Sequence, residues 1–169
     1  MSFDENFSEG TPSGAGARFF TAKPHLGAYA ILIEFKRFEK DVPLYKPKEQ
    51  VYTDKNTGQK SVRTITHEDI AYADLTVFAS EEHIEAGKPS VELQNQKINQ
   101  RLLAADLANE KPGALLVKKL VQLPTNALVW RPVEGDVIKK VGRYYDEREA
   151  ALKATLDEAG EDLPEWARA

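Results

Sequence analysis

Two segments of this chain alternate apolar and polar side chains with the period of two that a β-strand imposes. Residues 28–36 read AYAILIEFK and carry a large apolar side chain at every odd-numbered position from 29 to 35. Residues 70–79 read IAYADLTVFA and place small or aliphatic side chains at the odd-numbered positions. Aromatic and β-branched residues of this kind favour strands, so the chain is predicted to build its core on a β-sheet.

Other segments add helices and weaker strands to this pattern. A short helix is expected over residues 100–110, and a long helix over residues 135–158, with Asp136 as its N-cap and Gly160 at its C-terminal end. Three further strands are expected over residues 90–98, 114–124 and 127–133.

The order of these elements predicts a mainly β fold with helices. Five strands with a helix between the third and the fourth, followed by a long C-terminal helix, are the layout of an OB-fold-like barrel. A closed barrel also removes most exposed strand edges. A five-stranded ferredoxin-like or split α+β sandwich would give a similar order and stays open as the alternative.

A basic hairpin is expected to project from this fold. Residues 50–66 hold two short β-prone runs on either side of Asn56-Thr57-Gly58, and glycine supplies the positive φ that a hairpin loop needs. Lys55, Lys60 and Arg63 fall near the tip or flanks of this hairpin. Pro43 and Pro47 precede it and should interrupt regular strand pairing.

Charge is unevenly distributed along the chain. The net charge is −4, yet residues 18–63 carry ten basic and five acidic side chains, and residues 101–145 carry eight and four. Screening limits surface fields to about 8 Å at physiological salt, so a basic groove on an acidic protein can still bind a polyanion. On charge alone, ordinary solvated surfaces remain the alternative.

Composition along the chain divides it into three parts. Residues 1–17 are acidic, rich in Gly and Ser and without periodicity, which predicts a flexible tail. Residues 18–158 form the expected domain, and residues 159–169 form an acidic C-terminal tail.

Several enzyme classes are excluded by what the sequence lacks. The chain has no Cys, only three His, no HExxH motif and no Gly-x-Ser-x-Gly motif. Residues 67–69 (His-Glu-Asp) are interpreted as a solvated loop, because adjacent residues of an extended segment point in opposite directions. We therefore expect no enzymatic activity, no metal and no cofactor. No apolar run reaches the roughly 18 residues of a membrane span, and the acidic first residues do not resemble a secretory signal, so a cytoplasmic protein is expected.

Three stretches resemble a known family. The run GAYAILIE at 27–34, the strand IAYADLTVF, and the closing pair KKL at 118–120 and NALVWRP at 126–132 resemble the small OB-fold, single-stranded DNA-binding proteins of tailed bacteriophages. The resemblance covers roughly residues 19–145. It implies sequence-tolerant binding of single-stranded DNA during phage DNA replication or recombination. A phage virion or assembly protein acting through protein–protein contacts is the alternative.

Such binding needs cations along the phosphate path and flat side chains for unstacked bases, and these serve DNA and RNA alike. The two basic blocks supply both kinds of side chain. The predicted nucleic-acid-binding residues are Lys36, Arg37, Tyr45, Lys46, Lys48, Tyr52, Lys55, Lys60, Arg63, Lys118, Lys119, Trp130 and Arg131.

The C-terminal tail resembles the partner-docking tail of the same family. Those tails are acidic with an apolar tip and recruit replication or recombination proteins, which implies the same role here for Asp162, Leu163, Pro164 and Trp166. This chain departs from the pattern by continuing through residues 167–169. No coiled-coil heptad specifies an oligomer, although a homo-oligomer would lengthen the binding track.

Overall fold

The computed structural model describes residues 17–162 of the chain, with side chains to residue 157. Its strands are β3 (Arg18–Phe19), β4 (Ala30–Thr53), β5 (Lys60–Phe78), β6 (Val91–Ile98), β7 (Leu115–Gln122) and β8 (Leu128–Pro132). Its helices are the 3₁₀ turn η1 (Lys23–His25), α1 (Glu81–Glu85), α2 (Arg101–Ala108) and α3 (Gly135–Asp162). No helix in this part of the chain combines the length and the apolar character that a membrane crossing requires.

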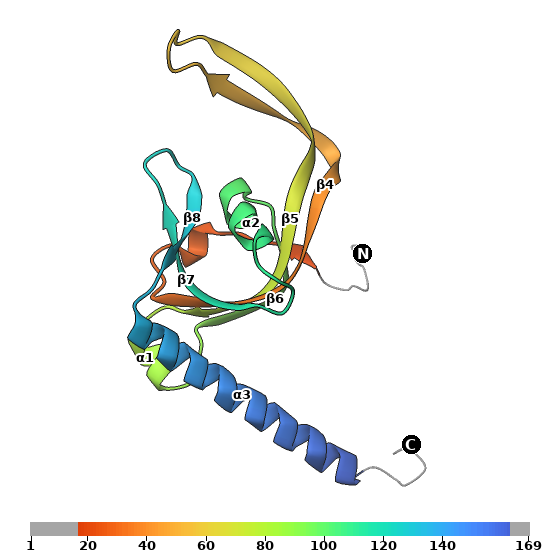
Figure 1. Cartoon of the computed structure of the whole chain (residues 1–169), viewed down its shortest axis with the longest axis vertical. Coiled ribbons are helices and arrows are strands. Elements are labelled where there is room, and N and C mark those ends of the chain that lie inside the picture. The colour runs from red at the N-terminus through yellow and green to blue at the C-terminus, as the bar shows by residue number, and fades with distance from the viewer. Residues whose placement is uncertain (1–16, 163–169) are drawn as a thin grey trace, which may run out of the picture.

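All six strands belong to one open sheet in the order β3-β6-β5-β4-β7-β8. Every neighbouring pair is antiparallel except the short β3, which runs parallel to β6. The strand content is 47%, so the expectation of a mainly β fold with a long C-terminal helix is confirmed. The closed five-stranded barrel is not confirmed, because the strands pair as an open sheet that curves around α2 (Figure 1).

β4 and β5 form one long hairpin of 24 and 19 residues, which joins the two strands and the projecting hairpin expected from the sequence. Its outer part, residues 44–66, rises away from the rest of the sheet and is called the arm below (Figure 1). Pairing shifts register at three places. The first shift, between Phe35 and Arg37, reverses which residues of β4 face each side of the sheet, because Phe35 pairs with Ala73 and Arg37 with Tyr72; the others lie between Glu39 and Val42 and between Pro43 and Lys48. The prolines were expected to interrupt pairing here, because proline has no N–H to donate to a ladder.

One face of the sheet, the inner face, packs against α2. Odd-numbered residues of β4 and β5, including Ile33 and Leu75, meet Leu103 and Leu107 of α2 in a buried cluster. Ala71 and Ala73 in the same cluster have no exposed surface, and their small side chains leave room for the helix. The apolar alternation of both strands therefore arises from burial against α2.

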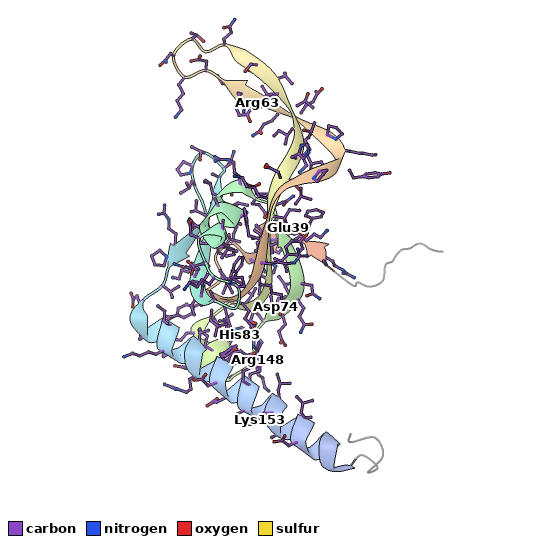
Figure 2. The ribbon with its side chains drawn as sticks, turned by 45° about the vertical axis from the view of Figure 1, so that its right-hand side comes forward. Glu39, Arg63, Asp74, His83, Arg148 and Lys153 are labelled. Carbon is purple, nitrogen blue, oxygen red and sulfur yellow. The ribbon has the colours of Figure 1, made fainter. Side chains whose placement is uncertain are left out.

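The opposite, outer face is covered at one end by α1 and α3. Ala30, Leu32 and Phe78 of the sheet pack against a second apolar cluster: Ile84 of α1 and Val137, Val141 and Tyr144 of α3. Arg148 of α3 donates two hydrogen bonds to Glu34 of β4, at 2.9 and 3.2 Å. This pair links α3 to β4, and Figure 2 labels Arg148 on the helix.

The ends of α3 differ from the sequence-based expectation. The N–H groups of Val137 and Ile138 donate to the carbonyl of Glu134, so Asp136 lies inside the first turn and the prediction of Asp136 as N-cap is wrong. The helix also continues through Gly160 to Asp162. Asp162, the first residue of the predicted partner-docking segment, is thus the last residue of α3, and Leu163, Pro164 and Trp166 lie outside the described residues.

Candidate nucleic-acid interface

Four side chains lie side by side across the outer face, one from each of four neighbouring strands. Phe19 of β3 is paired with Lys97 of β6, Lys97 with Tyr72 of β5, and Tyr72 with Arg37 of β4. Residues directly opposite each other in a sheet project from the same face. Phe19, Lys97, Tyr72 and Arg37 therefore form a straight line of alternating rings and cations, called the cross-strand row below.

The cations of this row contact its rings. Lys97 Nζ lies 5.1 Å from the centre of the Phe19 ring, and Arg37 Cζ lies 3.8 Å from the centre of the Tyr72 ring. Both distances are typical of cation–π contacts. Phe19 is 54% exposed, so one aromatic face of the row is open to a ligand.

Glu39 of β4 closes a small network at the end of the row. The Tyr72 hydroxyl donates to Glu39 Oε1 at 2.7 Å, and the Arg37 guanidinium forms an ion pair with Glu39 Oε2. Both contacts lower the pKa of the Glu39 carboxyl, and the hydrogen bond from Tyr72 has the larger effect. Burial and the hydrogen bond to Glu39 raise the pKa of the Tyr72 hydroxyl. Glu39 is therefore ionised and Tyr72 is protonated at neutral pH.

Two lysines predicted to bind phosphate are held by acidic neighbours. Lys36 Nζ lies 3.3 Å from Asp74 Oδ2 and donates to Asn95 Oδ1 at 3.1 Å. Lys48 Nζ lies 3.3 Å from Glu68 Oε1 at the base of the arm. Both lysines remain about half exposed, whereas the side chains of Asp74 and Glu68 are 25% and 13% exposed, so each ammonium group is accessible to solvent while its carboxylate partner is largely covered.

The arm carries a second group of the predicted residues. Residues 44–66 contain five basic and two acidic side chains, a net charge of +3. Arg63 Cζ lies 4.7 Å from the centre of the Tyr52 ring, and the Tyr52 hydroxyl donates to Gln50. Figure 2 labels Arg63 on the arm and Glu39 nearer the arm's base.

Alternation along β5 assigns the arm residues to faces. The odd-numbered Ala71, Ala73 and Leu75 face α2, so Arg63 continues the inner face of the hairpin. Tyr52 shares that face because Arg63 lies over its ring. The basic and aromatic face of the arm is therefore continuous with the inner face, opposite to the cross-strand row.

The other predicted binding residues of the arm are exposed. Tyr45 is 96% exposed, and Lys46 beside it is exposed in the stretch where pairing is irregular. Lys55 lies in the turn between β4 and β5, and Lys60 begins β5 opposite Thr53. The expected hairpin tip with its lysines is thus present.

The second basic block divides between the two faces of β7 and β8. Lys119 is paired with Arg131 and lies 5.5 Å from the Tyr29 ring on the outer face. Lys118 is paired with Ile31 and points to the inner face. The predicted cations thus lie on both sides of the sheet rather than along a single flank.

Trp130 does not belong to an accessible surface. It is 6% exposed, packs near Phe20 at 6.3 Å between ring centres, and donates its Nε1 hydrogen to the carbonyl of Leu103 at 3.2 Å. Its pairing with the buried Leu120 turns it toward α2. The indole is therefore a core side chain that joins β8 to α2, which corrects its assignment as a stacking platform.

Three members of the cross-strand row were not predicted. Tyr72 could have been predicted from the sequence, because the alternation of residues 70–79 places it on the face opposite the small core residues. Phe19 and Lys97 could not have been predicted, because their position beside Tyr72 depends on how β3, β6 and β5 pair.

Comparison with known proteins assigns neither a family nor a function to this chain. No protein-family model, curated protein or solved structure matches the chain. The functional argument therefore depends on the cross-strand row, the arm and their chemistry.

Proposed function

We propose that this protein binds single-stranded nucleic acid with little sequence preference and performs no chemistry on it. The observation that carries the proposal is the cross-strand row of alternating rings and cations on an open sheet face. Rings supply stacking surfaces that accept any base, and cations neutralise the phosphates between them. No base-specific arrangement is required for either contact.

The spacing of the row favours an unpaired strand over a duplex. Neighbouring strands lie about 4.8 Å apart, so Phe19 and Tyr72, two strands apart, present rings separated by about 10 Å. Bases in a duplex repeat every 3.4 Å or so along each strand and cover each other's faces. Only bases that are already unstacked can reach both rings.

The arrangement of strands supports an OB-like, partly open barrel as the finer description of the fold. The five strands β4 to β8 have α2 between the third and the fourth, and the tips of β4–β5 and β7–β8 rise on the same side of the sheet (Figure 1). OB-folds bind oligonucleotides with their second and third strands and with the first–second and fourth–fifth loops. Here those strands are β5 and β6, which carry Tyr72 and Lys97.

In this proposal the arm adds phosphate contacts beyond the cross-strand row. Its basic and aromatic face continues the inner face of the sheet, so a strand that engages both the row and Arg63 passes around the edge of the β4–β5 hairpin. Lys46, Lys55, Lys60 and Arg63 are the exposed cations that supply them, with Lys119 and Arg131 on the fourth–fifth hairpin. The setting is DNA replication or recombination in the cytoplasm, as in the bacteriophage proteins that the sequence resembles. Replication or recombination proteins would dock on the acidic C-terminal segment.

Titration of a labelled oligo-dT tests the proposal. Binding is expected at micromolar protein in low salt, and it should weaken steeply with salt, because each neutralised phosphate releases counterions. A duplex of equal length should bind more weakly than the single strand. Absence of oligo-dT binding at low salt would refute the proposed function.

A further inference from the structure

The carboxylate of Glu39 sits where a ligand's phosphate would be expected. One carboxylate oxygen accepts a hydrogen bond from the Tyr72 hydroxyl, and the other pairs with the Arg37 guanidinium. Tyr72 and Arg37 are the hydrogen-bond donors at the β4–β5 end of the row. A phosphodiester likewise offers two anionic oxygens on one centre, and arginine recognises carboxylate and phosphate with the same fork of donors.

We propose that Arg37 and Tyr72 form a phosphate subsite and that Glu39 occupies it as an internal competitor of the ligand backbone. The inference rests on the proposed function and names the place of one phosphate. Lys97, the next cation of the row, also lowers the pKa of Glu39, so the subsite lies in the field of two cations. A polyanion arriving there must displace a single carboxylate.

Displacing the Glu39 carboxylate from Arg37 should cost little free energy. The Glu39 side chain in its pair with Arg37 is 41% exposed, and Arg37 is 54% exposed, so the released carboxylate enters water instead of being buried without a partner. Exposed ion pairs of this kind are weak. β4 also loses its regular register with β5 directly after Glu39, and Asp41 has a φ of 54°. Between Glu39 and Lys48, β4 therefore keeps only two regular pairs with β5, Val42 with Glu68 and Pro43 with His67.

Neutralising Glu39 while keeping its shape tests the subsite. Glu39→Gln should bind oligo-dT about two- to fivefold more tightly at low salt, the gain expected from removing one exposed competing pair. Glu39→Asp, which is too short to reach both partners, should shift affinity in the same direction. Glu147→Gln is the matched control: it makes the same change in net charge at an exposed position on α3, away from the row.

A double variant separates the subsite from general charge. In an Arg37→Ala background, Glu39→Gln should give a clearly smaller gain, because Glu39 has then lost its directly paired cation and only the more distant field of Lys97 remains. The inference is overturned if Glu39→Gln binds like the wild type or like Glu147→Gln, or if its gain is undiminished without Arg37. Failure of the wild type to bind oligo-dT at all would instead refute the proposed function. Melting temperatures of the variants verify that each one is folded.

Discussion

Removal of the Phe19 ring is the change that most directly weakens the cross-strand row. Phe19 is 54% exposed and stands at the β3 end of the row, where its ring meets only Lys97 among the row's other members. A base stacked on an aromatic side chain is worth about 1–3 kcal/mol. Phe19→Ala should therefore weaken oligo-dT binding by about 5- to 150-fold, at about 1.4 kcal/mol for each factor of ten.

The cost of Phe19→Ala to folding should be small. Burying a whole Phe side chain contributes about 1.5–3 kcal/mol, and roughly half of this ring is already in water, so the loss is about 1 kcal/mol. In a chain of this size that lowers the melting temperature by about 2–4 °C. The expected loss of binding free energy, about 1–3 kcal/mol, thus equals or exceeds the expected loss of folding free energy, about 1 kcal/mol.

Fluorescence anisotropy with labelled oligo-dT at fixed low salt measures the first effect, and a thermal melt measures the second. Ile138→Ala provides the control, because Ile138 is an apolar side chain of α3 with similar exposure, 47%, outside the row. If Phe19→Ala remains folded and binds within a factor of two of the wild type, the row is not a stacking platform.

Three other variants test the arm, the core and the position of α3. Reversing the charge of Lys55, Lys60 and Arg63 together should weaken binding and flatten its salt dependence without lowering the melting temperature; unchanged affinity would remove the arm from the interface. In a Trp166→Phe protein, the fluorescence of Trp130 should resist acrylamide and should not be quenched by oligo-dT, because Trp130 is 6% exposed; strong quenching by the oligonucleotide would contradict its burial. Glu34→Gln should cost about 1–3 kcal/mol of stability, because it removes the charge of the carboxylate that takes two hydrogen bonds from Arg148 and leaves only the longer contact to Glu149, at 3.4 Å. Calorimetry should then show a melting temperature about 2–10 °C lower, and an unchanged value would mean that this pair does not hold α3.

The features that the sequence predicted correctly are those set by local patterns. The alternation of residues 28–36 and 70–79 identified the faces of β4 and β5 near α2, because burial of every second residue repeats along each strand. Gly58 was expected to supply the positive φ of the hairpin loop, and its φ is 69°. The register shift between Pro43 and Lys48 agrees with the expectation from Pro47, whereas Pro43 itself stays paired with His67.

The features that it could not predict depend on contacts between distant segments. The burial of Trp130 could not be predicted, because the residue lies next to Arg131 in the sequence. Its Nε1–H finds a buried acceptor, the carbonyl of Leu103, only because α2 packs against β8 in the folded chain. The cross-strand row requires the registers of three strand pairs at once. Shifting any of them by one residue would turn the shifted side chain to the other face, and no local pattern specifies that register.

Photocrosslinking with a 5-iododeoxyuridine oligonucleotide, followed by peptide mapping, tests the central claim most directly. An unpaired strand on the outer face should crosslink at Phe19 and Tyr72, with further crosslinks at the accessible Tyr45 of the arm. Crosslinks confined to Tyr144 and Tyr145 of α3, or an absence of crosslinks at a saturating oligonucleotide concentration, would contradict the placement of the strand on the cross-strand row.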